Sequence, residues 1–504
     1  MLANVLAQAA TGFKAPDLDY AALSPEIVLT GVLVAILLLD LVVDETRKYL
    51  VTQLAGVGVL VCLIPVVALG VDGADRSMFG GAYVVDDFAL LFKGLFLAIG
   101  YVVLLMSTRY IQEGEYYEGE YSFLLLSALL GMVVMASSRD LISIFVALEL
   151  LSIPAYMLAG WRKRDLKSNE AALKYYLLGV LASAVMLYGM SLVFGATGST
   201  VLRTIGREVG GSAGDEPLVT LGIFLIVVGF AFKVSAVPFH FWAPDTYEGA
   251  PTPVTAFLSV ASKAAGFVAL LQLVYVGFFG REEVWGPLFW VLAALTMTVG
   301  NLVALRQTNL VRMLAYSSVA QAGYILVPFA VAGDSPQAAG TAQTATIVYL
   351  VIYAAMNLGA FAMVMAVAGK TRSAEISSYG GLFTYAPGLT VLMTIFVFSL
   401  AGIPPLGGWF AKLAIFQAAL DAGTSTAVIL AVIAGVNSVI ALFYYASVAR
   451  EMWMRPVPDE DRSPIPVPAP LAAALGLTAV MVVAVGIYPQ AIARLGDLAH
   501  LTAG

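Results

Sequence analysis

The sequence predicts an all-α, polytopic membrane protein with about 14 transmembrane helices. Of its 504 residues, 60% are hydrophobic and only 12% are charged, and the mean hydropathy is +0.90. Soluble domains carry about 25% charged residues, so this composition is typical of an integral membrane protein. Apolar runs of about 17–25 residues also recur along the whole chain, and each can cross a hydrocarbon core of about 30 Å.

Fourteen apolar runs are expected to form the spans. In order they are residues 22–43, 50–70, 84–107, 121–137, 140–160, 172–196, 217–240, 252–279, 285–304, 308–332, 342–369, 387–420, 424–450 and 467–492. The seventh contains a proline and the twelfth contains GIPPLGGWF, so both are expected to be broken. An even number of spans places both termini on the same side of the membrane.

The loops predict the orientation. Of the 26 lysines and arginines, 13 lie in odd-numbered loops, seven in even-numbered loops or tails, and six within spans. The stretch WRKRDLK (161–167) contributes much of this bias. Because basic loops stay in the cytoplasm, the odd-numbered loops are expected inside and both termini outside.

A faint internal repeat is visible. The pattern P-x-x-x-W occurs at 238–242 and again at 405–409, which is 167 residues later. The same spacing places Arg139 on Arg306. A repeated unit of five helices must be inverted in the membrane, and inverted repeats with broken helices are typical of transporters.

The repeat divides the single membrane domain, residues 1–504, into four parts. These are helices 1–3 (22–107), a first repeat of helices 4–8 (121–279), a second repeat of helices 9–13 (285–450) and helix 14 (467–492).

Two charged residues inside spans have the same local setting. Glu149 and Lys233 each lie in an apolar run, and each is followed five residues later by a proline, Pro154 and Pro238. A proline inside a helix frees the carbonyl four residues before it, next to the charged residue in both cases. Since a charge in the membrane is costly, we expect the two residues to form an ion pair that takes up and releases protons.

Two more lysines lie deep in the membrane. Lys263 follows Pro253 by ten residues, which corresponds to about 15 Å of helix and places it near the middle of the bilayer. Lys412 lies just after the unwound stretch GIPPLGGWF. We therefore expect Lys263 to be a central proton relay and Lys412 its continuation toward the other side.

Other charged groups are less distinctive. Lys174 begins the sixth span, and His240 follows the break of the seventh; both are candidates for the relay, His240 the weaker one. Glu26 and Lys93 lie near the ends of spans and are expected to reach water at the interface.

Redox chemistry within this chain is not expected. A single cysteine, Cys62, excludes a cysteine-ligated iron–sulfur cluster, and no nucleotide-binding loop or metal-ligand motif is present.

The longer motifs resemble one protein family. They are FVALELLSIPAYMLAGWRKRDLKSNEAALKYYLLG, FKVSAVPFHFWAPDTYEGAPTPVTAFLSVASKAAGF, RQTNLVRMLAYSSVAQAGY and SLAGIPPLGGWFAKLAIF. Together they resemble the antiporter-like subunit N (subunit 2) of proton-pumping NADH:quinone oxidoreductase, respiratory complex I. The resemblance covers about residues 22–490.

The resemblance implies roles for individual residues. The family's charged residues in helices 5, 7, 8 and 12 match Glu149, Lys233, Lys263 and Lys412, and a further lysine matches Lys174. It also implies 14 helices, two inverted repeats, no cofactor in this subunit, and proton translocation coupled to quinone reduction elsewhere in the complex. The implied partners are neighbouring membrane subunits and lipid, and the implied location is the bacterial plasma membrane.

Two positions depart from the family pattern. Gln321 occupies a site where many relatives have histidine, and Arg312 replaces a frequent lysine. A titrating role at either position is therefore in doubt.

Two other functions remain open from the sequence. The chain could be a subunit of a multi-subunit cation/proton antiporter, whose subunits share these motifs. It could also be a scaffold that moves no ions. Purification in mild detergent separates the first from complex I, and charge-neutralised variants test the second.

Overall fold

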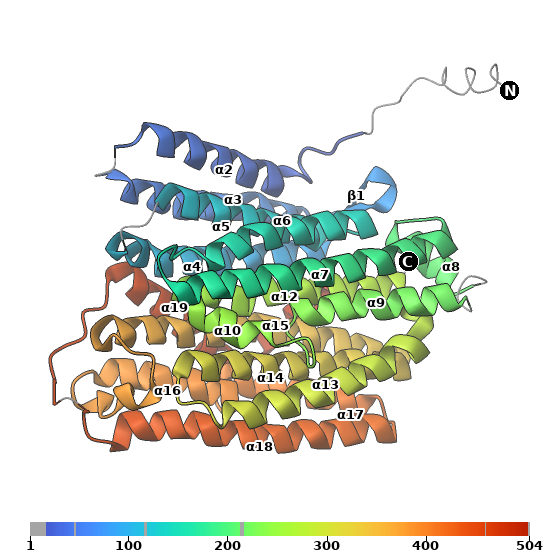
Figure 1. Ribbon diagram of the computed structural model, residues 1–504. Coiled ribbons are helices and arrows are strands. Elements are labelled where there is room, and N and C mark those ends of the chain that lie inside the picture. The colour runs from blue at the N-terminus through green and yellow to red at the C-terminus, as the bar shows by residue number, and fades with distance from the viewer. Residues whose placement is uncertain (1–16, 45–46, 115–117, 212–215, 459, 502–504) are drawn as a thin grey trace.

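The computed structural model describes residues 17–44, 47–114, 118–211, 216–458 and 460–501. Its long helices lie side by side in one bundle (Figure 1). In these residues, 12 helical segments are long and apolar enough to cross a membrane. Two further passes are each divided between two shorter helices, which brings the total to the predicted 14. The expected all-α, multi-pass membrane fold is confirmed.

The first six passes precede the first break. They are α2 (Ser24–Val42), α3 (Tyr49–Asp72), α4 (Asp87–Glu113), α5 (Glu118–Ser137), α6 (Leu141–Ala159) and α7 (Leu166–Thr197). A hairpin of β1 (Arg76–Met78) and β2 (Tyr83–Val85) joins α3 to α4, and the short α8 (Leu202–Val209) follows α7.

The seventh pass is divided into α9 (Pro217–Lys233) and α10 (Trp242–Gly249). The eighth consists of α11 (Thr252–Phe257), a π-helical turn (Leu258–Ser262), α12 (Lys263–Gln272) and a second π-helical turn (Leu273–Gly277). The remaining helices are α13 (Glu282–Ala304), α14 (Leu310–Val331), α15 (Pro336–Thr371), α16 (Pro387–Ala401), α17 (Gly407–Asp421), α18 (Ser425–Met454), α19 (Ala469–Ile487) and α20 (Gln490–Leu498).

Local sequence explains where several of these helices begin. The side chain of Asp140 accepts hydrogen bonds from the first backbone N–H groups of α6, and Asn309 does the same for α14. Asp165 and Thr424 cap α7 and α18 in the same way. Side-chain oxygens at this position satisfy N–H groups that have no partner within the helix.

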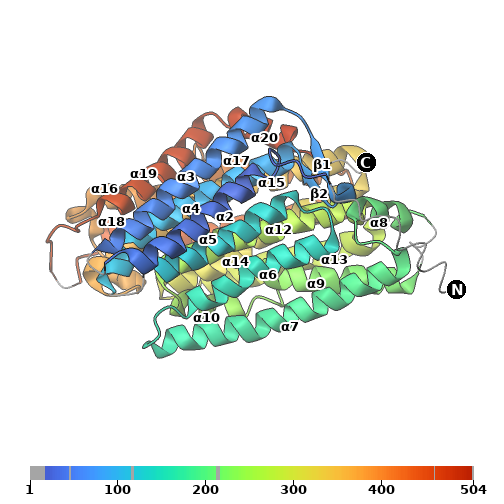
Figure 2. The same cartoon turned by 90° about the horizontal axis from the view of Figure 1, so that it is seen from above.

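The broken helices and their neighbours occupy the interior. In its most apolar stretch the eighth pass is wholly buried and α15 is 94% buried, whereas only 28% of the corresponding residues of α7 and α18 are buried. Seen from above, α12, α14 and α15 lie among the other helices, and α7 lies at the edge (Figure 2). Charged residues on the interior helices are therefore shielded from lipid.

Two matching backbone bridges support the inverted repeat. Asp140, before α6, pairs with Val201, after α7. Asn309, before α14, pairs with Glu375, after α15. The first bridge lies beside α8, and the second lies at the opposite end of the bundle, where α16 begins (Figures 1 and 2). The same local structure thus occurs at both ends, as expected when a unit is repeated upside down.

The bridges correct one predicted equivalence. The N–H of Leu202 donates to the Arg139 carbonyl at 2.9 Å, and in the second repeat Ile376 donates to the Thr308 carbonyl at 2.8 Å. Thr308, rather than Arg306, therefore corresponds to Arg139. A constant spacing of 167 residues fails here because the connecting segments of the two repeats differ in length.

Pro154 does not break its helix, whereas Pro238 follows the end of α9. α6 runs without interruption from Leu141 to Ala159, with Pro154 inside it. On the neighbouring α5, a Cβ at Gly131 would lie 2.6 Å from the backbone nitrogen of Leu151, so the two helices are in direct backbone contact. This close packing holds α6 together across the hydrogen bond that the proline removes.

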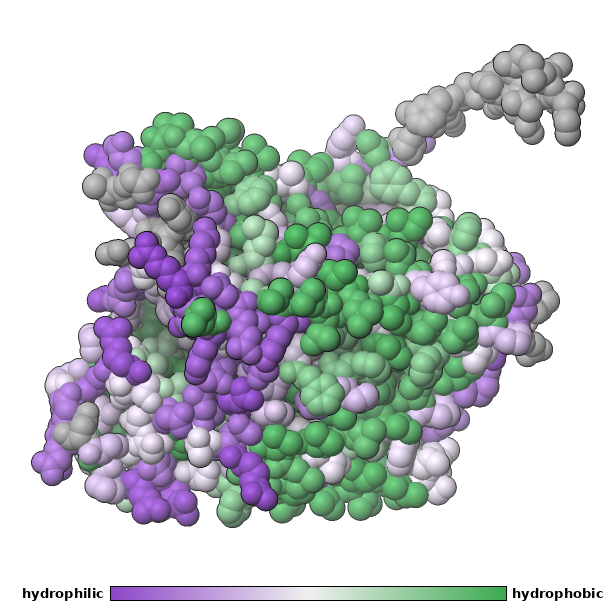
Figure 3. Space-filling model, viewed as in Figure 1, coloured by the Kyte–Doolittle hydropathy of each residue, from purple (hydrophilic) through white to green (hydrophobic). Residues whose placement is uncertain are grey.

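The surface matches a membrane protein. In Figure 3, hydrophobic residues cover a broad area of the visible face. Hydrophilic residues gather mainly at the left end of that view and form a thinner rim at the right end. The loops at the two ends therefore face water, and the hydrophobic area between them fits the lipid.

Candidate functional site

The first half of the seventh pass, α9, ends inside the bundle at a lysine. Lys233 is the last residue of α9, and the chain becomes helical again only at Trp242. The Trp242 indole N–H donates to the carbonyl of Phe232 at 3.0 Å, which ties the second half-helix back to the first. Because carbonyl groups without helical partners give the end of a helix a partial negative charge, a basic residue is favoured at this position of α9.

The unwound segment is held by a helix from the second repeat. The backbone N–H of Val237 donates to the hydroxyl of Thr296, on α13, at 2.9 Å. The next residue, Pro238, has no N–H to satisfy. The break is therefore a supported structure with hydrogen-bond partners.

Glu149 and Lys233 do not form the expected direct ion pair. Lys233 is 4% exposed and donates to the hydroxyl of Ser152, on α6, at 2.8 Å. Glu149 instead accepts a hydrogen bond of 2.5 Å from Ser183, on α7. No ion pair within 4.0 Å joins the two charges among the described residues. Each charge therefore has its own hydroxyl partner. The partner of Lys233, Ser152, lies one turn after Glu149 on the same helix.

Lys263 begins α12, the helix against which the Lys233 side chain packs. It is 1% exposed and follows the π-helical turn Leu258–Ser262. Its ammonium donates to both the carbonyl and the hydroxyl of Ser318, on α14, at 2.7 Å each. One turn further on, a Cβ at Gly266 would lie 3.2 Å from Lys233 Cγ, so the Lys233 side chain packs directly on α12.

Helix α14 continues the polar contacts toward the second break. One turn after Ser318, the amide of Gln321 donates to the carbonyl of Leu400, on α16, at 3.1 Å. Gln321 also accepts a hydrogen bond from the Tyr349 hydroxyl and lies 3.4 Å from that of Tyr445. The glutamine therefore links Lys263's partner to the end of α16, although an amide cannot titrate.

Lys412 occupies the second break. It lies in α17, is 4% exposed, and donates to the carbonyl of Ala401, the last residue of α16, at 2.8 Å. Its ammonium also lies 4.7 Å from the centre of the Tyr324 ring. Lys412 is thus held at the carbonyl end of the first half-helix, as Lys233 is in the other repeat.

The structure does not bring Lys174 to the buried lysines. Its side chain is 42% exposed and forms ion pairs of 2.7 Å with Glu170 and with Asp245, on α10. Arg312 binds Asp245 and Glu248 at 3.0 and 2.7 Å. These charges hold α10 between α7 and α14 at the surface of the molecule.

His240 lies in the first break and is 6% exposed. Its ring packs near Phe241 and Tyr316. Its Nδ1 belongs to a group of buried polar atoms without a protein hydrogen-bond partner in the interior. The others near the lysines are Tyr175 Oη, Ser235 Oγ, Tyr247 Oη, Ser262 Oγ and Asn357 Oδ1. Such groups are usually satisfied by ordered water, so this part of the interior is suited to hydration.

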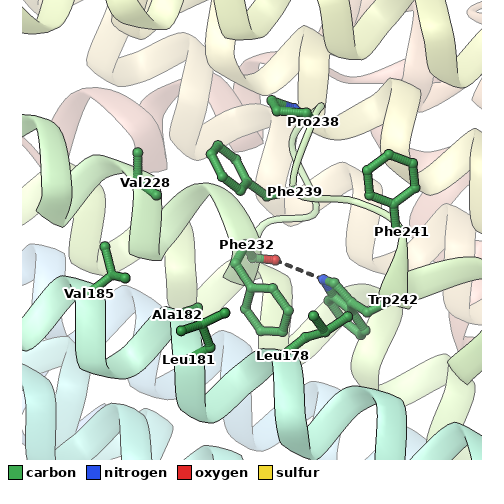
Figure 4. Close-up of a pocket in the computed structure, with 10 residues that line it drawn as sticks. All are labelled: Leu178, Leu181, Ala182, Val185, Val228, Phe232, Pro238, Phe239, Phe241 and Trp242. Atoms are coloured by element: carbon green, nitrogen blue, oxygen red, sulfur yellow. Dashed lines mark hydrogen bonds between the residues drawn. The ribbon is translucent and has the colours of Figure 1, made fainter.

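An apolar groove lies beside the first break on the outer side of α7 and α9 (Figure 4). It measures about 390 Å³, and its walls include Phe232, Phe239, Phe241 and Trp242. None of the ten lining residues is charged. The groove therefore provides no polar route from the break to the lipid.

Glu26 and Lys93 were predicted to reach water at the interface, and this prediction is wrong. Their side chains form an ion pair of 2.8 Å, and Lys93 is fully buried. The hydroxyl of Tyr83, in β2, donates to Glu26 at 2.5 Å. The hairpin covers this pair, and a hairpin between two spans gives no clear signal in hydropathy.

Ser152 and Ser318 were not predicted as partners of the lysines, and Gln321 was not predicted to bind the end of α16. Serine and glutamine in apolar helices are common, and their contacts join residues at least 55 positions apart. Only the distance of one turn between Ser318 and Gln321 in YSSVAQAGY could have indicated a shared polar face.

Chemically, the arrangement can carry protons. Three buried lysines and a half-buried carboxylate follow one another from α6 to α17, with hydroxyl, carbonyl and amide groups between them. Each lysine can exchange a proton with such neighbours or with water. No group of three His, Cys, Asp or Glu that could hold a metal was found in the described part of the chain.

Comparisons with known proteins agree with this geometry. The family described as "NADH:quinone oxidoreductase/Mrp antiporter, TM" matches residues 138–438. NADH-quinone oxidoreductase subunit N of Trichlorobacter lovleyi is 41% identical over 86% of this chain and 88% of its own length. Subunit N 1 of Koribacter versatilis is 40% identical over 95% and 94%.

Solved structures give the same result. A chain of respiratory complex I from Thermus thermophilus is 33% identical, with a TM-score of 0.76 over 95% of this chain and 100% of that one. A chain of the Mrp complex from Dietzia sp. DQ12-45-1b is 22% identical, with a TM-score of 0.82 over 96% and 97%, and this likeness shows the fold alone. The chain therefore belongs to the family of NADH-quinone oxidoreductase subunit N, the proton-pumping, antiporter-like membrane subunit of complex I.

Proposed function

We propose that protons cross this subunit through Glu149, Lys233, Lys263 and Lys412. The observation that carries the proposal is that every buried lysine of the relay has a polar partner on a neighbouring helix: Lys233 with Ser152, Lys263 with Ser318, and Lys412 with the Ala401 carbonyl. Buried polar atoms without protein partners, such as Ser262 Oγ and His240 Nδ1, suit the space between these pairs to water that would pass the proton on. Lysines without such a purpose would be too costly to keep in a buried apolar interior.

Glu149 and Lys233 act as the switch in this proposal. With separate serine partners, as observed, the carboxylate gives the ammonium little support and Lys233 can release its proton. Movement of Glu149 toward Lys233 would favour the charged form and reload it. The serines thus define one of the two states.

Lys174 and His240 take lesser roles. Lys174 belongs to the half-exposed ionic cluster with Asp245, so we assign it to proton uptake at the surface. His240, buried in the break, can pass a proton between that surface and Lys233.

The two repeats would form two half-channels. We assign residues 121–279 to the first and 285–450 to the second, with 22–107 and 467–492 outside them. Lys263, from the first repeat, binds Ser318, from the second, and so joins the two halves.

The subunit acts within an assembly. We propose that it lies in the bacterial plasma membrane between other membrane subunits of complex I, with both termini outside the cytoplasm. Electron transfer to quinone takes place elsewhere in the complex, and this chain holds no cofactor of its own. The bias of basic loops and the single cysteine support these assignments.

The proposal is tested in the assembled complex in sealed vesicles. Glu149→Ala, Lys233→Ala, Lys263→Ala and Lys412→Met are each expected to lower proton pumping, and tight coupling should lower NADH oxidation as well. The amount of assembled complex serves as the control for folding. Normal assembly and parental pumping in all four variants would falsify the relay.

A double variant separates a switch from a static link. If Glu149→Ala with Lys233→Ala restored full pumping, the two charges would only neutralise each other. We expect no such rescue, because the pair itself carries the proton.

A further inference from the structure

Among the described residues, Lys412 has no carboxylate partner within 4.0 Å. Another buried lysine, Lys93, does have one and forms an ion pair with Glu26. Its ammonium donates to one carbonyl, that of Ala401. The other close group is an aromatic ring, that of Tyr324, with its centre 4.7 Å away. A cation within about 6 Å of a ring face is attracted by the negative face of the ring, most strongly where water is absent.

The ring of Tyr324 is held in place. Tyr324 is 1% exposed, and its hydroxyl accepts hydrogen bonds from Asn301, on α13, at 3.5 Å and from Ser438, on α18, at 3.3 Å. Asn301 is in turn bound by Asn437 and Tyr444. Two helices thus fix the ring through its hydroxyl.

The lysine side chain is also confined. A Cβ at Gly402 would lie 2.8 Å from Lys412 Cδ, so the side chain passes directly over this glycine. The ammonium is therefore directed at the ring and the Ala401 carbonyl together.

We propose that Tyr324 is a positioning residue for proton transfer at Lys412, with its ring face acting as an uncharged partner of the ammonium. A carboxylate would attract the ammonium more strongly, but it would be left as an unpaired buried charge when the lysine gave up its proton. A ring leaves no such charge. The site can therefore be loaded and emptied without a second charge having to move.

The first repeat has a weaker form of the same contact. Lys233 lies 6.0 Å from the centre of the Tyr175 ring, and that ring is stacked on Trp242 with centres 4.4 Å apart. Lys233 also has Ser152 and, nearby, Glu149. We therefore expect the ring to matter more for Lys412 than for Lys233.

The test replaces Tyr324 in the assembled complex and measures proton pumping in sealed vesicles. Tyr324→Phe keeps the ring and is expected to pump within about twofold of the parent, whereas Tyr324→Leu is expected to lose about tenfold. Tyr275→Leu is the control. Tyr275 is also a buried tyrosine, but its hydroxyl donates to the Ala339 carbonyl and its ring is not the partner of a relay lysine.

A series of fluorinated phenylalanines at position 324 removes doubt about folding. Fluorine withdraws electron density from the ring face with little change of shape. Pumping should fall step by step with each added fluorine, and a purely structural ring would show no such trend. A flat series, or equal activity of the Phe and Leu variants, would overturn the inference.

The inference rests on the proposed role of Lys412, and the variant Lys412→Met separates the two. If Lys412→Met pumps at the parental rate, the proposed relay fails at this residue. If it stops pumping while the fluorinated series stays flat, the relay stands and only the role of Tyr324 is wrong.

Discussion

Each of the two broken helices has a buried lysine at its break, but the lysine lies in a different half of the helix in the two repeats. In the first break, the lysine is the last residue of the first half-helix, Lys233 at the end of α9. In the second, Lys412 lies in the second half-helix, α17, and reaches back to the Ala401 carbonyl at the end of α16. Each break thus has a lysine at the carbonyl end of its first half-helix, Lys233 by its position in the chain and Lys412 by its hydrogen bond, and a basic residue is favoured there.

Neither lysine has a lysine at the equivalent position of the other repeat. The spacing of 167 residues between the two P-x-x-x-W motifs places Leu400 opposite Lys233, and Asp245 opposite Lys412. A lysine at one position in one repeat therefore corresponds to a leucine or an aspartate in the other. The common requirement is a cation at the end of the half-helix, and the position from which it comes is free to vary.

The surroundings of the two breaks differ in charge. Asp245, opposite Lys412, forms ion pairs with Lys174 and Arg312 near the surface. In the described part of the second break, Lys412 has carbonyl and aromatic partners. The first break is thus connected to surface charges, and the second is enclosed in neutral groups.

Relocating the second lysine tests the comparison with the largest expected effect. Lys412→Leu alone should lower pumping at least about tenfold, because a proton-transfer group is lost. Adding Leu400→Lys returns a lysine to the position that Lys233 occupies in the first repeat, and part of the activity should return. The measurement is proton uptake by sealed vesicles at equal amounts of assembled complex. An inactive double variant that assembles normally would show that position, and not only the end of the half-helix, matters.

Gln321 tests the link from α14 to the second break. Gln321→Leu removes the hydrogen bond to the Leu400 carbonyl and leaves buried groups without partners, so pumping should fall by about three- to tenfold. Gln321→His keeps a polar ring at this position and should retain most of the activity. The ratio of protons pumped to NADH oxidised is the measurement. Equal activity of the Leu and His variants would remove Gln321 from the path.

Asp245 should give the smallest effect. Asp245→Asn removes the ion pairs of a group whose side chain is 37% exposed, and exposed pairs contribute little. We expect a decrease of about twofold in pumping that becomes smaller at high salt, since salt already screens the original pairs. A loss as large as that of Lys412→Leu would mean that Asp245 carries protons itself.

Much of the fold could be predicted because membrane spans depend on local composition. The 14 passes and both breaks follow from apolar length and from the motifs at 238–242 and 405–409. Pro154 shows the limit of local rules, because close packing of α5 on α6 holds the helix together across a proline. Arg139 shows another, since equivalent positions shift where the connecting segments differ.

The candidate site was only partly predictable. Depth in a span indicated Lys263 and Lys412, which lie in the interior as expected. Contacts between distant residues could not be read from the sequence, so the serine partners of the lysines and of Glu149 were missed, and Lys174 was grouped with residues that it does not meet. Buried pairs such as Lys93 with Glu26 depend on which helices become neighbours.

The hydrogen bond between Val237 and Thr296 also has a consequence for biosynthesis. The ribosome makes Thr296 59 residues after Val237, so the first break lacks this partner while the first repeat is being inserted. Neither half is an ordinary span by itself: α9 has 17 residues, which corresponds to about 25 Å of helix. The seventh pass can therefore reach its final conformation only after α13 has entered the membrane. In a nascent chain truncated before residue 296, the unwound segment between α9 and α10 should lack its fixed conformation.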